Sequence, residues 1–405
     1  MAGLRQVLCR LVLYSLFTVA SCRIRPEDRD ALWRLYELTS GSTWRMRGGW
    51  SADGDPCLMS SRWAGVGCTD PCKRWHDGDD CALGRVTALS LDQNGLSGDI
   101  SNWTALGQLH NLTILDLTGN SLLGTLPTEI GRIQNLESLQ FPNNKLSGTL
   151  PTELGAINSN GAFVLEEIGA NSNSISGTIP SSLGLLTGLT SLNFKSNQLS
   201  GVLPSSLATL GKLSVLYAQD NPGLGGSLPD LSGLTRLHYI DVSRARLSGT
   251  MPSSIGDLTM LQRLHLDENS LSGSLPNELT NCSQLHSLRL GSNRFTGELP
   301  AEIGKLYSLR LLDVYNNSMI GDVPRCRANA RAVPTQHFTF NRPCLLSPQR
   351  STLFLRCSQL HPRSAESARA LLGQRALAAT PEALLWPTST QYGSVQLPHH
   401  SRRVR

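Results

Sequence analysis

Two short stretches of this 405-residue chain hold side chains that could perform chemistry. The run His76-Asp-Gly-Asp-Asp80 offers an imidazole and three carboxylates, which are common metal ligands. It lacks the Asp-x-Asp-x-Asp-Gly register and the distal Glu of a calcium loop, so we interpret it as a solvated turn and expect no metal site. Glu166 and Glu167 are adjacent on an expected strand, where neighbours point to opposite faces, so we do not expect an acid–base pair.

Other catalytic signatures are missing from the sequence. It contains neither the Gly-x-Ser-x-Gly elbow that presents a serine nucleophile nor a phosphate-binding Walker loop. We therefore expect a protein that is not an enzyme and takes no cofactor. The formal net charge of +5 comes from the two ends of the chain and leaves residues 23–344 near −3, which gives no support for nucleic-acid binding.

The elements that position the side chains recur with a period of about 24 residues. Each unit carries the spacing Leu-x-x-Leu-x-Leu, as in Leu285-His-Ser-Leu288-Arg-Leu290. A proline after an apolar residue closes each unit: Pro127, Pro151, Pro180, Pro204, Pro229, Pro252, Pro276, Pro300 and Pro324. Because one unit cannot bury its Leu-x-Leu strand alone, the pattern predicts an α/β repeat solenoid of about ten stacked units from Val86 to Pro324.

An asparagine marks the turn after most strands, two residues before the next apolar position: Asn94, Asn120, Asn144, Asn173, Asn197, Asn269, Asn293 and Asn317. We expect its amide to bond backbone groups of its own and the neighbouring unit, because buried polar groups must be paired. One unit has an extra residue after Asn221 and the next has Ala245 in the asparagine position, so we expect an irregularity near residues 221–246. Five extra residues before Leu165 should lie on the convex side.

The second half of the unit, as in LSGTLP (146–151), ISGTIP (175–180) and LSGSLP (271–276), resembles plant-type extracellular leucine-rich repeats. That class includes receptor-kinase ectodomains and polygalacturonase-inhibiting proteins. The segment DALWRLYELTSGSTWRMRGGW, with DPC at 55–57 and WAGVGC at 63–68, resembles the N-terminal cap of the family. The resemblance covers about residues 26–330 and implies a leucine-rich repeat superhelix, although this sequence shows neither a kinase domain nor a membrane span.

The expected organisation is a signal peptide (1–22), a cap (23–84), repeats (85–325), a C-terminal cap (326–344) and a disordered basic tail (345–405). Secretion favours disulfides. We expect Cys57 to pair with Cys68, Cys72 with Cys81, and Cys326 with Cys344, while Cys282 should be a buried thiol. Four sequons are candidates for N-glycosylation: Asn102, Asn111, Asn281 and Asn316, of which Asn281 competes with burial of its neighbour.

The concave face of the expected sheet is the candidate binding surface. Reading outward strand positions from the repeat gives a central column of Ser90, Asp116, Gln140, Gly169, Asn193, Tyr217, Asp241, His265, Arg289 and Asp313. The column before it contributes Tyr239 and Arg263. Stacking predicts one patch made of Tyr217, Tyr239, Asp241, Arg263, His265 and Arg289. Tyr and Arg are enriched at binding hot spots, because they offer rigid area and directional donors.

These features favour a secreted, non-catalytic recognition module that binds a protein or peptide on its concave face, in extracellular signalling or defence. Signalling would require a membrane co-receptor. The alternative, suggested by the resemblance, is a cell-wall module that binds polysaccharide or inhibits a wall hydrolase, and aromatic stacking on sugars by Tyr217 and Tyr239 keeps it open. A surface-active template would need one residue type down a column, whereas these columns vary.

Overall fold

The computed structural model describes residues 24–57, 62–69, 84–157 and 165–321, together with the backbone of three short strands between residues 345 and 356. The expected signal peptide, the cysteine pairs Cys72–Cys81 and Cys326–Cys344, residues 158–164 before Leu165 and the C-terminal cap lie outside the described residues. Within the part described, no helix is long and apolar enough to cross a membrane.

The chain opens with a cap on helix α2 (Pro26–Leu38), which begins with proline at its first turn. Ala31, Leu32 and Leu35 are buried under the first repeat, and a short 3-10 helix η1 (Gly41–Thr43) follows. The expected disulfide between Cys57 and Cys68 is present and closes the cap. Aromatic side chains fill the space beside the helix in stacked and edge-on pairs: Trp33, Tyr36, Trp44, Trp50 and Trp63.

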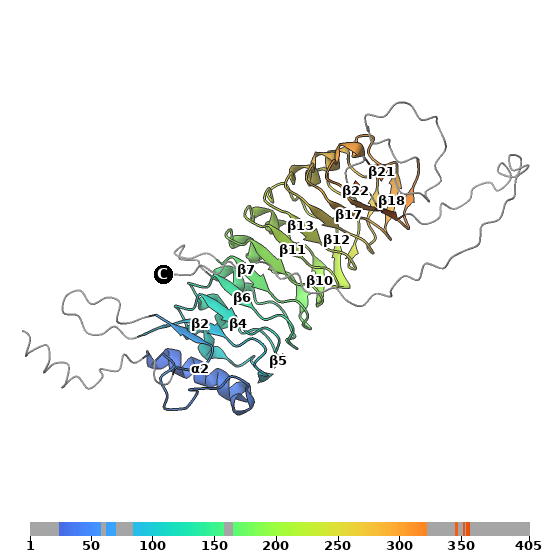
Figure 1. Ribbon diagram of the computed structural model, residues 1–405. Coiled ribbons are helices and arrows are strands. Elements are labelled where there is room, and N and C mark those ends of the chain that lie inside the picture. Colours follow the sequence, from blue (N-terminus) through green and yellow to red (C-terminus); the bar gives the residue numbers. More distant parts are fainter. Residues whose placement is uncertain are drawn as a thin grey trace, which may run out of the picture. The chain divides into compact units, whose positions relative to one another are not determined.

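A twelve-stranded sheet, called the main sheet below, runs through the repeats (Figure 1). Its first strand is antiparallel to the second, and the others are parallel. In order, the strands are β1 (Val66–Cys68), β2 (Val86–Ser90), β4 (Ile114–Asp116), β6 (Ser138–Gln140), β7 (Glu167–Gly169), β9 (Ser191–Asn193), β11 (Val215–Tyr217), β13 (Tyr239–Asp241), β15 (Arg263–His265), β17 (Ser287–Arg289), β19 (Leu311–Asp313) and β23 (Phe354–Arg356). The central apolar residue of each strand is opposite its counterpart one repeat away, as Leu264 is opposite Leu288.

Short strands in the second half of each unit form smaller parallel sheets. They are β3 (Ser97–Asp99) with β5 (Ser121–Leu123), then β8 (Ser176–Thr178), β10 (Gln198–Val202), β12 (Gly223–Gly226) and β14 (Arg246–Leu247), and finally β16 (Ser272–Gly273), β18 (Arg294–Gly297) and β20 (Ser318–Met319). They carry the Leu-Ser-Gly segments, whose glycines have positive φ, as Gly201 has at +74°. Each leucine of these segments turns back into the core.

Most units are completed by a 3-10 helix, because the residues left between a proline and the next strand are too few for a long α-helix. Proline precedes most of these helices with φ near −65°, as Pro180 does. The helices are η2 (Thr104–Gln108), η3 (Thr128–Arg132), η4 (Thr152–Ala156), η5 (Ser181–Leu185), η6 (Ser205–Thr209), η7 (Ser253–Asp257), η8 (Asn277–Asn281) and η9 (Ile303–Lys305). Leucines and isoleucines from the helices and the strands together form one buried core along the repeats.

The asparagines form a continuous ladder beside the main sheet, as the repeat predicts. Asn197 is typical: its Nδ2 donates to the carbonyls of Ala170, Phe194 and Lys195 at 3.0–3.2 Å, and its Oδ1 accepts from Ile175 N–H at 3.0 Å. Each amide thus bonds its own turn and the preceding repeat. The asparagine ladder comprises Asn120, Asn144, Asn173, Asn197, Asn221, Asn269, Asn293 and Asn317, while Asn94 bonds the cap at Met46 instead.

The irregularity expected near residues 221–246 is confined to the loops. Asn221 keeps its place in the ladder, and β11, β13 and β15 stay in register. Where Ala245 cannot accept from Leu224 N–H, that group donates to the carbonyl of Asn221 at 3.0 Å. Among the described residues, the segment 227–238 of this unit carries no 3-10 helix.

The sheet extends beyond the boundary expected from sequence. Two antiparallel strands, β21 (Leu345–Leu346) and β22 (Ser351–Thr352), and the strand β23 lie in the segment we expected to be disordered. β23 pairs in parallel with β19 and places Leu355 in the register position next to Leu312. An uncovered β19 would expose a row of unpaired backbone groups, and β23 covers that edge.

Candidate functional site

The register of the main sheet brings the six predicted residues together. Tyr217 on β11 is opposite Asp241 on β13, Asp241 is opposite His265 on β15, and His265 is opposite Arg289 on β17. In the preceding column, Tyr239 is opposite Arg263. These six residues, called the sheet-face patch below, are half-buried except for the exposed Arg263. Four adjacent strands therefore present one contiguous surface.

The two residues of the preceding column contact each other. The Arg263 guanidinium carbon lies 5.2 Å from the centroid of the Tyr239 ring, within the range of a cation–π interaction. The Tyr239 hydroxyl donates to Gln262 Oε1 at 3.1 Å. Tyr239 is thus held at both its ring face and its hydroxyl, which lowers the entropy cost of ordering it on binding.

Asp241 and His265 form the charged centre of the sheet-face patch. His265 Nδ1 lies 3.6 Å from Asp241 Oδ2, while Asp241 Oδ1 accepts from the hydroxyl and the N–H of Ser243 at 2.7 and 3.0 Å. Burial is the largest influence on the pKa of Asp241 and raises it, but the contacts with His265 and Ser243 together bring the pKa below its ordinary value. Asp241 therefore stays ionised.

Two neighbouring groups have raised pKa values. Burial raises the pKa of Tyr217, opposed by Arg263 and reinforced by Asp241 and Tyr239. The phenol therefore remains a neutral hydrogen-bond donor. Burial also raises the pKa of Asp267, just after β15, and the charge of Asp241 adds to the effect.

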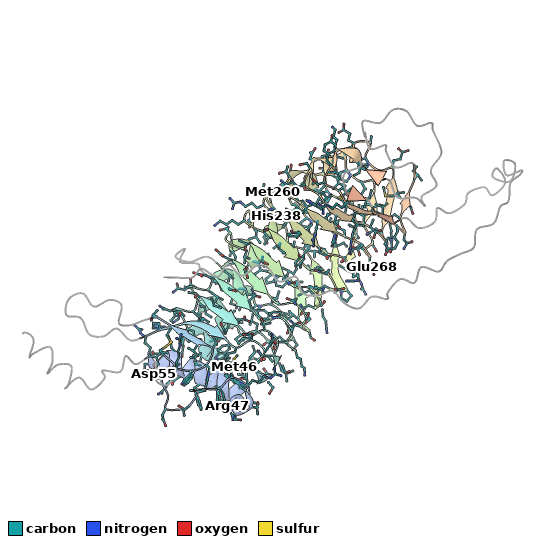
Figure 2. The ribbon with its side chains drawn as sticks, viewed as in Figure 1. Met46, Arg47, Asp55, His238, Met260 and Glu268 are labelled. Carbon is teal, nitrogen blue, oxygen red and sulfur yellow. A yellow bond between two sulfur atoms is a disulfide. The ribbon has the colours of Figure 1, made fainter. Side chains whose placement is uncertain are left out.

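A column of side chains that sequence reasoning missed lies beside the patch. The carbonyl of Ser214 accepts from both His238 N–H and Tyr239 N–H, so the chain bends just before the strand and both side chains reach the surface. The carbonyls of Glu166, Gln262 and His286 likewise each accept hydrogen bonds from two successive backbone N–H groups. Figure 2 shows His238 and Met260 at one edge of these repeats and Glu268 at the other. The signal in the sequence was the polar residue directly before each strand.

This bend also corrects the interpretation of Glu166 and Glu167. Both are exposed, rather than on opposite faces, because β7 begins only at Glu167 and strict alternation applies only from there. Glu167 Oε2 accepts a hydrogen bond from Gln140 Nε2 at 3.2 Å, so one of the two carboxylates already has a hydrogen-bond partner.

The arrangement around His265 has the composition of a nucleophilic triad without its setting. Ser287 Oγ lies 2.9 Å from His265 Nε2, and Asp241 follows on the other ring nitrogen. The Asp241 contact is too long for a good hydrogen bond. The strand N–H groups beside Ser287 are used in the sheet, whereas an oxyanion hole needs converging donors. We interpret these contacts as ordering the surface for binding.

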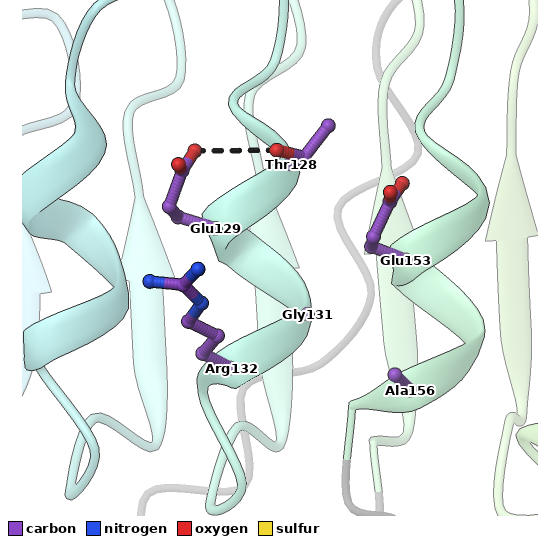
Figure 3. A pocket seen from close by; sticks show the side chains of 6 residues that line it. All are labelled: Thr128, Glu129, Gly131, Arg132, Glu153 and Ala156. Atoms are coloured by element: carbon purple, nitrogen blue, oxygen red, sulfur yellow. Dashed lines mark hydrogen bonds between the residues drawn. The ribbon is translucent and has the colours of Figure 1, made fainter.

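The described residues offer no group of three or more metal-ligating side chains, and residues 76–80 lie outside them. A hollow between η3 and η4 is lined by Thr128, Glu129, Gly131, Arg132, Glu153 and Ala156 (Figure 3). None of these is a predicted site residue. A Cβ at Gly131 would collide with the carbonyl of Glu153, so the glycine allows the close approach of the two 3-10 helices.

The remaining predicted residues are placed as follows. Asn102, Asn281 and Asn316 are exposed and Asn111 is half-buried. Asn281 ends η8 with its side chain outward while Cys282 is buried, so the two do not compete. Cys282 Sγ contacts the carbonyl of Ile255 at 3.2 Å, and burial raises the pKa of its thiol to about 12, as expected for an inert core cysteine.

Comparison with known proteins identifies the repeats. The family model "Leucine Rich Repeat" matches residues 111–133, 135–157, 188–210, 260–282 and 284–306. An inactive leucine-rich repeat receptor-like serine/threonine-protein kinase of Arabidopsis thaliana is 44% identical over 59 residues, which are 15% of this chain and 9% of that protein.

Solved structures agree over a larger part of the chain. The ectodomain of the Arabidopsis thaliana receptor kinase GASSHO1/SCHENGEN3, in complex with CASPARIAN STRIP INTEGRITY FACTOR 2, is 32% identical with a TM-score of 0.65, covering 73% of this chain and 33% of its own. The plant peptide hormone receptor RGFR1, in complex with RGF2, is 36% identical with a TM-score of 0.54, covering 57% and 36%. A plant ice-binding protein is 25% identical with a TM-score of 0.58, covering 75% and 90%. The matched region thus spans about a third of the two receptor chains.

Proposed function

We propose that this leucine-rich repeat protein is an extracellular, non-catalytic recognition module that binds a protein or peptide partner on the exposed face of its main sheet. The observation that carries the proposal is the sheet-face patch, where two tyrosines and two arginines from adjacent strands meet. Within it, Arg263 lies over Tyr239 and His265 contacts Asp241, so these four side chains lose little entropy on binding. The similar solved structures include a plant peptide hormone receptor, RGFR1, which supports a peptide as the ligand.

An extracellular location is supported by the Cys57–Cys68 disulfide, because such bonds persist in oxidising compartments. The sequons, three of them exposed, agree with it. A membrane co-receptor remains part of the proposal for signalling.

The polysaccharide alternative is less well supported by the geometry. A sugar would stack on an open aromatic face, but the Tyr239 ring is covered by Arg263. Tyr217 is half-buried and leaves only part of its ring to solvent. Nothing in the described surface specifically favours hydrolase inhibition.

Selection from a displayed library of random dodecapeptides tests the proposal. The wild-type chain should enrich a defined set of peptides, whereas a variant with Tyr217→Ala, Arg263→Ala and Arg289→Ala should lose at least tenfold affinity for them, as expected for hot-spot truncation. Tyr307→Ala is the matched control, because Tyr307 is 86% exposed after η9, away from the main sheet. Equal binding by the triple variant and the wild type would rule out the sheet-face patch.

A further inference from the structure

The exposed face of the main sheet carries its charged side chains unevenly: the first half is acidic, and the second half holds three arginines and three histidines beside three aspartates. In the first four repeats, its charged side chains are all acidic: Asp92, Asp116, Glu137, Glu166 and Glu167. In the last four repeats, arginine and histidine predominate: His238, Arg263, His265, His286, Arg289 and Arg310, accompanied by Asp241, Asp267 and Asp313. This separation of acidic from basic side chains is found on one surface, and the composition of the whole chain does not reveal it.

Three glutamates form the centre of the acidic half. Glu137, Glu166 and Glu167 come from adjacent repeats, and all three are exposed. Among the described residues, none of them lies within ion-pair distance of a lysine, arginine or histidine. Their mutual repulsion is therefore uncompensated within this part of the chain.

Three arginines form the centre of the basic half, and they too make no ion pair among the described residues. Arg263, Arg289 and Arg310 are each more than 4 Å from every described carboxylate oxygen. Of the acids nearby, Asp241 is held by Ser243 and His265, and burial raises the pKa of Asp267.

The strands between the two halves carry no charged side chain, although Lys195 just after β9 adds a positive charge there. On β9 and β11 the outward residues are Ser191, Asn193, Val215 and Tyr217. From β7 to β15 there are four strand-to-strand steps, which make roughly 19 Å at about 4.8 Å each. An extended peptide rises about 3.3 Å per residue, so roughly six residues bridge the two charged centres.

A second observation between the two halves points to a ligand. Gln219 lies just after β11 and is 8% exposed, yet its Oε1 has no hydrogen-bond partner among the described residues. A buried amide oxygen without a partner costs about 1–3 kcal/mol, which rotation of the side chain toward a backbone N–H of a bound chain would recover.

We propose that the ligand is an extended peptide with opposite charges at its two ends, lying across the strands. Its basic residues contact Glu137, Glu166 and Glu167, and its acidic residues, about six positions away, contact Arg263, Arg289 and Arg310. The middle of the peptide passes over Tyr217 and beside Gln219. This rests on the proposed function and adds the charge order of the peptide and its direction along the repeats.

The test uses the full chain and the peptides enriched from the random dodecapeptide library. They should carry Lys or Arg and Asp or Glu in two clusters about six residues apart. Synthetic copies should bind at least tenfold more tightly than peptides of the same composition with alternating charges, measured by fluorescence anisotropy. The difference should shrink between 50 mM and 500 mM NaCl, because salt screens exposed charges.

A variant with Glu137→Gln, Glu166→Gln and Glu167→Gln should bind these peptides about tenfold more weakly. It should no longer prefer Lys or Arg at the basic end of the peptide, but should still prefer Asp or Glu at the acidic end. The matched control changes Glu129, Glu153 and Glu278 to Gln, three glutamates on the 3-10 helices, and should leave binding unchanged.

Two results would overturn the inference while leaving the proposed function standing: enriched peptides without charge order, or equal binding by the glutamate variant. If the variant with Tyr217, Arg263 and Arg289 changed to Ala bound the peptides as tightly as the wild type, the proposed function would be overturned instead. A wild-type chain that enriches no peptide at all would overturn both.

Discussion

At the scale of the residue, one asparagine in most repeats supplies the side-chain hydrogen bonds that pair backbone groups of the turns. Each amide of the ladder donates to carbonyls in two successive turns and accepts at least one N–H, at a position that is buried or half-buried. A buried backbone group without a partner costs about 1–3 kcal/mol, so removal of one amide leaves several such costs. The unit with Ala245 avoids part of this cost only because Leu224 N–H finds the carbonyl of Asn221.

Asn197→Ala should lower the free energy of unfolding by about 3 kcal/mol, because it removes the partner of Ile175 N–H and of Ala170 carbonyl. Urea unfolding followed by circular dichroism measures the change. Gln284→Ala, at an exposed position, is the control and should stay within about 0.5 kcal/mol of the wild type. An Asn197→Ala protein as stable as its control would mean that the ladder contributes little.

Asp241 of the sheet-face patch and Asp267 beside it should respond to acid in opposite directions. The pKa of Asp241 is lower in the folded state than in the unfolded state, so the unfolded chain binds more protons. Its stabilising contribution is complete above its unfolded pKa, near 4, and is lost as the pH falls through the folded value. For Asp267 the pKa is raised, so its contribution improves as the pH falls.

Comparison of Asp241→Asn and Asp267→Asn with the wild type between pH 6 and pH 3 checks this. The stability that Asp241→Asn lacks relative to the wild type should shrink as the pH falls. For Asp267→Asn, the wild type should gain relative to the variant over the same range. The same trend in both variants would contradict the assigned pKa directions.

At the scale of the element, the cap helix α2 is attached to the first repeat by a buried ion pair. Asp28 is fully buried; its Oδ2 accepts from Val86 N–H at 2.9 Å and Arg85 Nε at 3.0 Å, and its Oδ1 lies 2.9 Å from the other guanidinium nitrogen. Trp103 Nε1 adds a bond to the carbonyl of Ala31 at 2.9 Å. The cap therefore covers the apolar end of the core and also provides a hydrogen-bond acceptor for the Val86 N–H at the start of the first repeat strand.

Asp28→Ala should destabilise the protein by about 3–5 kcal/mol, because it leaves the partly buried guanidinium of Arg85 without its counter-ion. Thermal unfolding by circular dichroism is the measurement. Asp30→Ala removes an exposed acid of the same helix, whose pair with Arg29 should contribute less than about 1 kcal/mol. Similar melting temperatures for the two variants would show that the ion pair does not hold the cap.

At the scale of the whole molecule, stability should spread from repeat to repeat. Each repeat contacts chiefly its neighbours, so the total approximates a sum of repeat terms and interface terms. The asparagine ladder is the polar part of that interface: the carbonyl of Phe194 accepts from Asn197 at 3.1 Å and from Asn221 at 2.9 Å. Substitutions in adjacent repeats should therefore interact.

A double-mutant cycle measures that interaction. Asn197→Ala and Asn221→Ala together should differ from the sum of the single effects by about 0.5–3 kcal/mol, because they share an acceptor. Asn197→Ala with Asp28→Ala, several repeats apart, should be additive within about 0.5 kcal/mol. Urea unfolding of the three single variants, the two double variants and the wild type supplies the values, and additivity of the adjacent pair would argue against coupling through Phe194.

Much of this protein was determined by its sequence alone. The 24-residue period with Leu-x-x-Leu-x-Leu predicted the repeats, the register and the ladder, because each depends on a local pattern that every unit repeats. The alignment of those units also placed Tyr217 beside Asp241 and Tyr239 beside Arg263. The pairing of Cys57 with Cys68 followed from the resemblance of the cap.

Only the tertiary structure decided the rest, because those features depend on contacts that the repeated local pattern does not specify. The carbonyl of Ser214 accepts hydrogen bonds from the N–H groups of both His238 and Tyr239, so both side chains turn outward. Simple alternation along a strand does not predict this. Asn221 supplies the carbonyl that replaces the missing amide at residue 245, and β23 covers β19 in a segment expected to be disordered. The separation of acidic from basic repeats emerges only when residues scattered over the sequence share one face.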